Sequence, residues 1–444
     1  MRLFWGLGFA LIVALGFWVG FRGGDEVQGS ESAGFLPAPT EPAAAPNQAA
    51  GQPTSQPAGQ PNPTPEPKAT PPAPKQVAPA PAPAVSATLP RAPAQRPEEA
   101  AIAAALLHRP WGEVSVLLSQ SNLEQDRRNL VGAVSAALAG DRERAQSFAR
   151  GLDKSDDLDA REKALVASAV QGTPVGAVAA SAGSESITAI AIALALRARD
   201  GDALLAAGRH AEAASAFSDV LLADATATWP MDREALQRWT ERLNRAQAGH
   251  RWNAKGAWPS ITVTVKPGDS LTSIRARVIK EHPEILVCTG LIQRVNQLRS
   301  DRDLHPGDKL RIPTERPHML VDISTRWVLY RVGNEVAAAW EGGVGKPGHE
   351  TVPGNYVIGD KLRNPSWFRP GKKPVPFGDP ENPLGTRWLA WVNNGVDSSL
   401  GFHGTGEPDS VGGAVSSGCV RMRNEDVEVL FEILPEKAAV QVQP

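Results

Sequence analysis

Residues 403–422 read HGTGEPDSVGGAVSSGCVRM and hold one histidine, one of the chain's two cysteines and an arginine. A thiol becomes an effective nucleophile when a base removes its proton and positive charge lies close to the thiolate. Glycines before and after these residues let the backbone come close to a reacting carbonyl. The stretch therefore predicts a thiol-based catalytic site with Cys419 as the nucleophile, His403 as the base and Arg421 as the neighbouring cation.

His403 and Cys419 can meet only if adjacent strands or loops bring them together, as an antiparallel sheet does. The imidazole then accepts the thiol proton and returns it to a leaving amine. A third group must orient the ring, and no Asp or Asn follows at a useful spacing, so we expect a backbone carbonyl near Gly404 in that role. The N–H groups of Gly418 and Cys419 are the candidates for an oxyanion hole. Arg421 either stabilises the thiolate or binds a substrate carboxylate.

The gross composition fits an exported protein with several parts. With 444 residues the chain is too long for a single core. Its net charge of −2 argues against nucleic acid as the main partner. Two cysteines cannot form a disulfide framework. Cys288 follows the apolar residues 285–287, so we interpret it as a small buried hydrophobe rather than a reactive thiol. No metal or cofactor is predicted.

The N-terminus is apolar from residue 3 to residue 21. As a helix this run spans about 28 Å, close to the thickness of a bilayer core. The flanking charges predict that the N-terminus stays inside and that the rest of the chain is exported. A cleaved signal peptide is the alternative, but the run is longer than a usual signal core and no Ala-x-Ala site follows closely. We expect residues 1–24 to be a membrane anchor or, failing that, a signal segment.

Residues 25–97 are interpreted as a disordered Pro/Ala-rich linker, since this segment holds roughly half of the chain's 39 prolines. Such a composition forms an extended, semi-rigid spacer. Residues 98–250 then show helical spacing, with turns predicted at 139–141 and 207–209. Residues 201–217 resemble a tetratricopeptide-type hairpin whose groove Phe217 and Leu221 would fill. An Ala-rich bundle that serves as a scaffold and an array that binds a protein partner both stay open.

Two Pro-Gly-Asp turns, at 267–269 and 306–308, organise residues 260–315. A strand is predicted before the first turn, helices between the turns, and a strand after the second. This arrangement resembles the LysM module, a strand-helix-helix-strand fold that binds N-acetylglucosamine polymers such as peptidoglycan; a purely structural α/β module is the alternative. The resemblance implies glycan contacts by Gly268, Asp269, Leu271, Asn296, Pro306 and Gly307.

Residues 317–444 are predicted to be mainly β. Strands are expected at 319–324, 327–332 and 336–340, in an antiparallel sheet or sandwich with long functional loops. Near the end, Asn424 can cap a helix with acidic residues in its first turn. The buried stripe of this helix is Val427, Leu430, Phe431 and Leu434.

The catalytic motif also belongs to a longer series of blocks. Upstream of His403-Gly404-Thr405 come Val-Gly-Lys-Pro at 344–347, Gly-Asn-Tyr-Val-Ile at 354–358, Asn-Pro-x-Trp at 364–367 and Asn-Pro-Leu-Gly-Thr-Arg-Trp at 382–388, and downstream comes Asn-x-Asp-Val at 424–427. In this order the blocks resemble the L,D-transpeptidase (YkuD-type) catalytic signature. Ser417 stands where that family often has a second histidine, which leaves His403 to do the acid-base work alone.

The resemblance implies acyl transfer on peptidoglycan stem peptides. Cys419 would attack the carbonyl of the third, diamino-acid residue of a tetrapeptide stem and expel D-alanine, and an amine on a neighbouring stem would resolve the thioester into a cross-link. With water as acceptor the enzyme is an L,D-carboxypeptidase, and a non-catalytic peptidoglycan-binding scaffold is the remaining alternative. The implied location is the cell envelope, outside the cytoplasmic membrane. Further residues expected to contact the substrate are Ser416, Ser417, Trp388, Tyr356 and Asn424.

Overall fold

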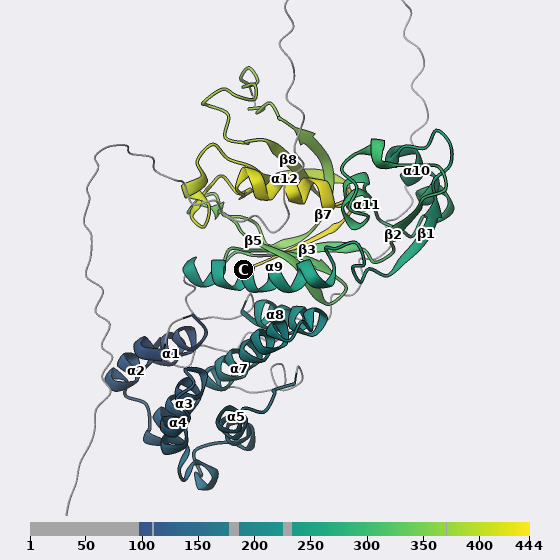
Figure 1. The fold of residues 1–444 in the computed structure, drawn as a ribbon. Helices are drawn as coiled ribbons and strands as arrows, with labels where there is room; N and C mark the ends of the chain where they lie inside the picture. The colour runs from purple at the N-terminus through teal and green to yellow at the C-terminus, as the bar shows by residue number, and fades with distance from the viewer. Residues whose placement is uncertain (1–96, 109–110, 177–185, 225–232, 370) are drawn as a thin grey trace, which may run out of the picture. The chain divides into compact units, whose positions relative to one another are not determined.

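The computed structural model describes residues 97–108, 111–176, 186–224, 233–369 and 371–444. The predicted anchor, and all of the predicted linker except Pro97, lie outside the described residues and stay predictions. In the described part of the chain, no helix is both long enough and apolar enough to cross a membrane. The described residues form a helical domain, a small α/β module and a mainly-β C-terminal domain (Figure 1).

The helical domain begins at α1 and ends at α9. Its helices are α1 (Pro97–His108), α2 (Trp111–Gln120), α3 (Gln125–Leu138), α4 (Arg142–Ala149), α5 (Ala160–Gln171), α7 (Ile187–Ala206), α8 (His210–Asp224) and α9 (Arg233–His250). Gly140 and Gly208 have φ angles of 80° and 73° at the two predicted turns, a conformation that glycine adopts at little cost. In the α7–α8 hairpin Phe217 is fully buried and packs against Gly201, where a Cβ atom would lie 2.8 Å from its ring. The tetratricopeptide resemblance itself stays a prediction.

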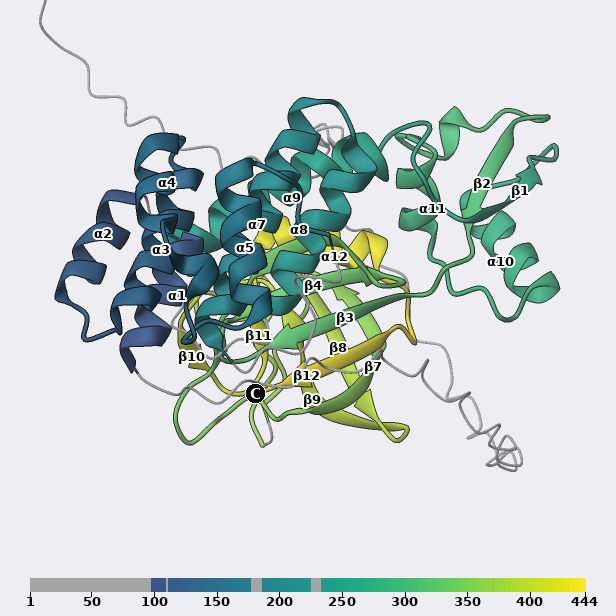
Figure 2. The same ribbon diagram turned by 90° about the horizontal axis from the view of Figure 1, so that it is seen from below.

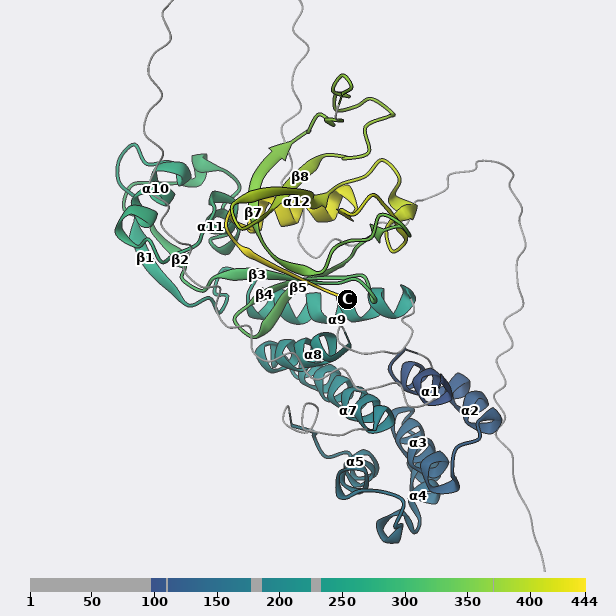
Figure 3. The same cartoon turned by 180° about the vertical axis from the view of Figure 1, so that it is seen from behind.

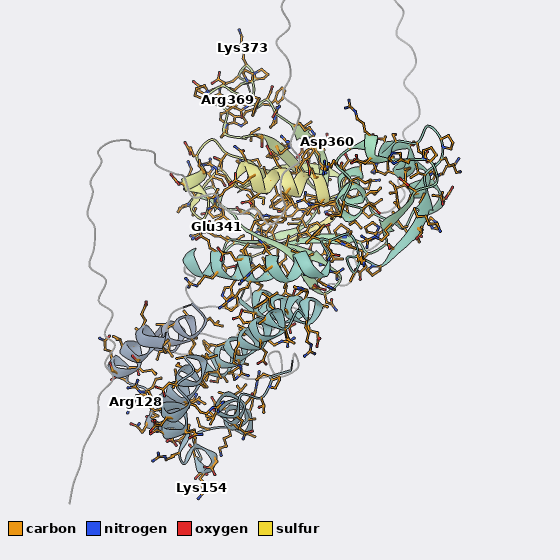
Figure 4. The ribbon with its side chains drawn as sticks, in the orientation of Figure 1. Arg128, Lys154, Glu341, Asp360, Arg369 and Lys373 are labelled. Carbon is orange, nitrogen blue, oxygen red and sulfur yellow. The ribbon has the colours of Figure 1, made fainter. Side chains whose placement is uncertain are left out.

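The small module has the predicted order of strand, helix, helix and strand: β1 (Ser260–Thr264), α10 (Leu271–Glu281), α11 (Thr289–Val295) and β2 (Lys309–Pro313), seen from behind in Figure 3. The two strands pair antiparallel, with Ser260 opposite Pro313 and Thr264 opposite Lys309. This register brings the two Pro-Gly-Asp turns together, because Gly307 N–H donates to Val265 O (2.9 Å). Turns that lie 39 positions apart in the sequence thus form one end of the module.

The C-terminal domain is built on an eight-stranded sheet, whose strands lie side by side in Figure 2. Its spatial order is β11-β9-β8-β7-β12-β3-β4-β5. The bounds are β3 (Pro317–Asp322), β4 (Trp327–Val332), β5 (Glu335–Glu341), β7 (Gly354–Arg363), β8 (Arg387–Asn393), β9 (Val396–His403), β11 (Val420–Arg421) and β12 (Ala439–Gln443). Two short strands outside this sheet, β6 (Val344–Gly345) and β10 (Ala414–Ser416), pair parallel. The expected antiparallel sheet needs one correction, because β11 runs parallel to β9 and β12 runs parallel to β3.

Strand β4 is buried on both faces, which places it between two hydrophobic cores. Val328 and Tyr330 belong to the core shared with α12 (Asn424–Ile433) and the small module. Trp327 and Leu329, which alternate with them, belong to the core of the helical domain. Since buried apolar area is the main stabilising contribution in folding, the helical domain acts as a packed layer of the structure rather than a detached spacer.

The helical domain also satisfies backbone groups of the edge strand β5. Ser218 Oγ accepts from Val336 N (3.0 Å), Gln247 Nε2 donates to Val336 O (2.7 Å), and Trp252 Nε1 donates to Ala337 O (2.8 Å). An open sheet edge would otherwise offer these groups to another chain. Side chains of α8, α9 and the segment that follows α9 therefore close this edge.

Helix α12 is held at its C-terminal end by groups from other elements. Tyr330 OH donates to Ile433 O (3.2 Å), Lys361 Nζ to Leu434 O (2.7 Å), and the Cys288 thiol to Glu432 O (2.9 Å). These bonds satisfy carbonyls that a helix end leaves without partners. Burial raises the pKa of the Cys288 thiol. This residue therefore fits its interpretation as a small packed side chain.

Candidate active site

Strand pairing at the sheet edge brings the three residues of the predicted catalytic motif together. In the parallel pair of β9 and β11, Arg421 stands opposite His403. Cys419 lies in the bend just before β11, and its thiol is 3.8 Å from the carbonyl oxygen of Ser399 on β9. The connection between His403 and Cys419 therefore returns the chain beside the strand that it left, and the charge of Arg421 lowers the pKa of both Cys419 and His403.

The orientation of His403 is set by its own backbone neighbour. Its Nδ1 lies 2.6 Å from the carbonyl oxygen of Gly404, and the side chain is buried. A carbonyl oxygen only accepts hydrogen bonds, so this short contact favours the tautomer with the proton on Nδ1 and the lone pair on Nε2. The structure thus places a backbone carbonyl in the position that the sequence left for a third catalytic group. That tautomer is the one required of a base that acts through Nε2.

Asn424 fixes the turn that supplies this carbonyl. Its Oδ1 accepts from the N–H groups of Thr386 and Thr405 (both 3.1 Å), and its Nδ2 donates to Thr405 O (2.8 Å). A Cβ atom at Gly404 would collide with Asn424 Oδ1, so only glycine fits at this position. The predicted capping role is corrected: Arg423 stands at the N-cap without a side-chain cap bond, and Asn424 binds the turn instead. Its role as a substrate contact stays a prediction.

Ser416 organises the loop that carries the nucleophile. Its hydroxyl donates to Cys419 O (2.6 Å) and accepts from Gly418 N–H (3.2 Å), and the side chain is buried. Gly418 has a φ of 110°, where side chains are strained. Since the Gly418 N–H is already bonded, Cys419 N–H is the one of the two predicted oxyanion donors that has no acceptor among the described residues. Ser417 is exposed beside them.

Burial keeps both reacting groups uncharged. It raises the pKa of Cys419 to about 11, although a backbone hydrogen bond from Gly401 and the charge of Arg421 act in the opposite direction. It lowers the pKa of His403 to about 4; backbone hydrogen bonds to Gly404 and Pro383 oppose this shift, and the charge of Arg421 adds to it. At neutral pH the pair is therefore a thiol and a neutral imidazole, and not a preformed thiolate–imidazolium pair. The proton has to move during the attack.

Arg421 is a buried cation whose backbone and side chain are both tied down. Its N–H and C=O exchange hydrogen bonds with Gly343 (2.8 and 2.7 Å). Its Nη1 donates to Glu407 Oε2 (3.1 Å) and to Ser410 Oγ (2.9 Å). Nε is buried and has no acceptor among the described residues. The guanidinium thus adds a fixed positive charge beside Cys419 and His403.

Two predicted substrate contacts from the sheet have different surroundings. Trp388 stands opposite His403 on β8, and the two rings stack with centroids 6.2 Å apart. The half-buried indole thus forms part of the wall around the base. Tyr356 is buried, packs against Trp391 and donates from its hydroxyl to Val352 O (3.0 Å). Its side chain supports the interior of the domain, and a substrate contact by Tyr356 stays a prediction.

In the small module, side chains of the predicted glycan contacts hold the fold. Leu271 is buried, Asp269 pairs with Arg277 (2.9 Å), and the Asn296 amide exchanges hydrogen bonds with the backbone of Arg311. Gly268, Pro306 and Gly307 lie on the two adjacent turns, where both glycines have positive φ. Among the predicted glycan contacts, the exposed backbone of these two turns is therefore the part available to contact a glycan.

Comparison with known proteins agrees with the motifs. A family model described as the L,D-transpeptidase catalytic domain matches residues 316–442, and a LysM domain model matches residues 263–313. YqjB of Bacillus subtilis, whose name places it among the L,D-transpeptidases, is 36% identical over 131 residues, which cover 29% of this chain and 68% of YqjB. The chain belongs to the L,D-transpeptidase family.

Other L,D-transpeptidases match the same part of the chain. YkuD of Bacillus subtilis is 29% identical over 188 residues, which cover 41% of this chain and 98% of YkuD. A crystal structure of an L,D-transpeptidase from Mycobacterium tuberculosis is 14% identical, covers 44% of this chain and 95% of that one, and has a TM-score of 0.25, a value that adds no argument about the fold. In this L,D-transpeptidase the LysM domain precedes the catalytic domain, as the two sequence resemblances implied.

Sequence reasoning missed two groups in the site of this L,D-transpeptidase, Glu407 and Ser410, which hold Arg421. Both lie in the quoted stretch 403–422, where acidic side chains and a hydroxyl in the loop before Arg421 were a signal for partners of the arginine. Thr386 was recognised in the sequence only as a member of the motif at 382–388, and its N–H donates to Asn424 Oδ1 in the structure. Among the described residues, no three His, Cys, Asp or Glu side chains are grouped to hold a metal ion.

Proposed function

We propose that this L,D-transpeptidase cross-links peptidoglycan through a thioester on Cys419. The observation that carries the proposal is the hydrogen bond between His403 Nδ1 and Gly404 O, because it leaves Nε2 as the candidate base on β9, the strand that the Cys419 thiol contacts. The substrate is a tetrapeptide stem whose third residue is a diamino acid, as the family resemblance implies. The acceptor is an amine on a neighbouring stem.

In the first step the sulfur of Cys419 attacks the carbonyl carbon of the diamino acid while His403 Nε2 takes the thiol proton. The developing oxyanion accepts a hydrogen bond from Cys419 N–H, the predicted donor that is still unbonded. When the C–N bond breaks, the imidazolium returns the proton to the amine of the leaving D-alanine. The products are free D-alanine and an acyl-thioester on Cys419.

In the second step the amine of a neighbouring stem attacks the thioester carbonyl. His403 removes a proton from this amine and gives it to the departing thiolate, which restores the resting thiol and neutral imidazole. A new amide bond joins the two stems. If water attacks instead, the same residues perform an L,D-carboxypeptidase reaction, which differs only in the acceptor.

The LysM domain supports a role at the cell wall, because its two adjacent turns would hold a glycan strand near the catalytic domain. Tethering raises the local concentration of stem peptides without any new contact in the active site. The reaction also needs an extracytoplasmic location, which the apolar run at residues 3–21 would provide as an anchor or as an export signal.

The test is to incubate the purified full-length protein with defined tetrapeptide muropeptides and to identify the products by mass spectrometry. We expect a cross-linked dimer and D-alanine from the wild type, no product from Cys419→Ala, and unchanged product from the matched control Cys288→Ala. A trimmed monomer without a dimer would favour the carboxypeptidase. Undiminished product from Cys419→Ala would overturn the cysteine mechanism, and no product from any donor would favour the scaffold.

A carbapenem offers a second readout, since the family resemblance implies acylation of the nucleophile by such drugs. One acyl adduct is expected on the wild type and on Cys288→Ser, and none on Cys419→Ser. An adduct that persists in Cys419→Ser places the reactive group elsewhere.

A further inference from the structure

The guanidinium of Arg421 is only partly used by the protein. An arginine side chain has five N–H donors. Nη1 donates to Glu407 and Ser410, whereas the buried Nε has no acceptor, and no bond from Nη2 is present among the described residues. The side chain of Arg421 is 11% exposed. A charged donor that is buried without a partner costs free energy, and the charge of Arg421 is close enough to lower the pKa of both Cys419 and His403.

The free edge has the shape that a carboxylate requires. Nε–H and one Nη2–H point in parallel and bind the two oxygens of a carboxylate together. Glu407 and Ser410 both bind Nη1, so this edge has no acceptor among the described residues. We propose that the Nε–Nη2 edge of Arg421 is a carboxylate subsite for the donor peptide, and that Glu407 and Ser410 position it through Nη1. The proposal rests on the proposed transpeptidase function.

The donor offers this chemistry from two sources. One is the terminal carboxylate of the leaving D-alanine; the other is a side-chain carboxylate on the diamino acid, present in diaminopimelate and absent from lysine. Both flank the scissile carbonyl, and Arg421 is only two residues from Cys419 in the chain. Recognition of either carboxylate would align that carbonyl with the thiol.

Glu407 and Ser410 act on the guanidinium in different ways. The side chain of Glu407 is 77% exposed, so its ion pair with Arg421 is screened by water and weak. Its negative charge nevertheless offsets part of the charge that a substrate carboxylate would meet. Ser410 is neutral, and its hydroxyl is oriented by a hydrogen bond to the carbonyl of Glu407. Loss of the charge and loss of the hydroxyl should therefore change substrate binding in opposite directions.

The experiment compares three donors with the full-length enzyme at a fixed acceptor concentration: a diaminopimelate tetrapeptide, its C-terminal amide, and the lysine tetrapeptide. The wild type should have a KM about ten-fold higher for the donor that lacks the recognised carboxylate, which identifies the source. Ser410→Ala should raise KM about ten-fold for the recognised donors with kcat within two-fold. Glu407→Gln should lower the same KM about three-fold. Neither variant should change KM for the donor without that carboxylate.

Asp409→Asn is the matched control, since it removes an exposed carboxylate from the same short 3-10 helix, 408–410, and no contact joins Asp409 to Arg421 among the described residues. It should leave every KM within two-fold. A thermal melt of each variant excludes misfolding as the cause. The proposal is overturned if the wild type treats all three donors alike, if Ser410→Ala changes all KM values equally, or if Glu407→Gln raises KM for the recognised donors.

Direct binding separates this proposal from the proposed function. If the wild type turns over none of the donors, the transpeptidase assignment fails. The affinities of the three peptides for the Cys419→Ala protein, measured by calorimetry, still test whether Arg421 forms a carboxylate subsite. The subsite is supported if the peptides with the recognised carboxylate bind more tightly than the peptide without it, and if Ser410→Ala weakens this binding. Equal affinity for all three peptides overturns it.

Discussion

The Nδ1 atom of His403 lies 2.6 Å from the carbonyl oxygen of Gly404, the next residue in the chain. In many thiol and serine enzymes a separate carboxylate or amide orients the base. Here a backbone carbonyl does so, and a carbonyl adds no full negative charge to stabilise an imidazolium. Burial therefore dominates the titration of His403 and holds its pKa at about 4.

The first prediction concerns the pH dependence of acylation. A depressed histidine pKa means that His403 stays neutral, and able to accept a proton, until the pH falls to about 4. The raised pKa of Cys419, about 11, means that the thiol stays protonated up to strongly alkaline pH. We expect kcat/KM for acylation to be nearly flat from about pH 5 to pH 9, measured by carbapenem adduct formation. An acidic limb centred near pH 6.5, the value of an ordinary histidine, would contradict the burial argument.

The second prediction concerns Asn424 as a positioning residue. Asn424→Ala removes the bonds to Thr386 and Thr405, so the Gly404 carbonyl loses its fixed position. We expect kcat to fall about 10- to 100-fold with KM changed less than three-fold, and stability to fall by about 1–3 kcal/mol. The matched control is Asn355→Ala at an exposed position of β7, which should have little effect. Equal loss in both variants, or an unchanged kcat in Asn424→Ala, argues against the positioning role.

Patterns with a short period were enough to predict much of this fold. The strand expected at residues 327–332 is β4. The buried stripe expected for α12 is confirmed at Val427 and Leu430, which are fully buried. The two Pro-Gly-Asp turns located the end of β1 and the start of β2 in the LysM module. These features follow from local rules, because side-chain alternation and turn conformations depend on residues that are close in sequence.

Long-range features could not be predicted in the same way. The parallel pairing of β11 with β9 depends on how the loop after His403 folds back, and no period in the sequence encodes it. A layer covering the second face of the sheet could have been predicted. Residues 327–332 are apolar at nearly every position, which indicates a strand that is covered on both faces. The bond from the predicted oxyanion donor Gly418 N–H to Ser416 likewise depends on the loop conformation.

The third prediction tests the cover on the sheet edge. Ser218→Ala removes the acceptor of Val336 N–H at a buried position of α8. We expect a loss of about 1–2 kcal/mol in the free energy of unfolding, measured by urea denaturation, since a buried N–H is left without its partner. Ser215→Ala, at an exposed position of the same helix, should change stability by less than about 0.5 kcal/mol. Equal effects of the two substitutions would show that the contact with β5 does not form.

The fourth prediction concerns Asp426 in the first turn of α12. Burial raises the pKa of this carboxyl to about 7, and Glu425 and Glu341 add to the shift while Arg423 opposes it. A folded-state pKa above the unfolded value of 3.8 means that the folded protein binds the proton more tightly, so stability falls as pH rises from about 4 to 7. Asp426→Asn removes this penalty and should raise the melting temperature at pH 8 by several degrees, with a smaller change at pH 5.

Glu425→Gln is the control, since Glu425 is the adjacent carboxylate of the same helical turn and its loss should give a smaller gain. Differential scanning fluorimetry at pH 5 and pH 8 measures both variants. A gain for Asp426→Asn that is equal at the two pH values would attribute the effect to helix propensity or packing. A loss at pH 8 would show that the ionised carboxylate is favourable beside Arg423, whose Nη1 lies 3.9 Å from its Oδ2. Only a gain that grows with pH agrees with a carboxyl that burial keeps protonated near neutrality.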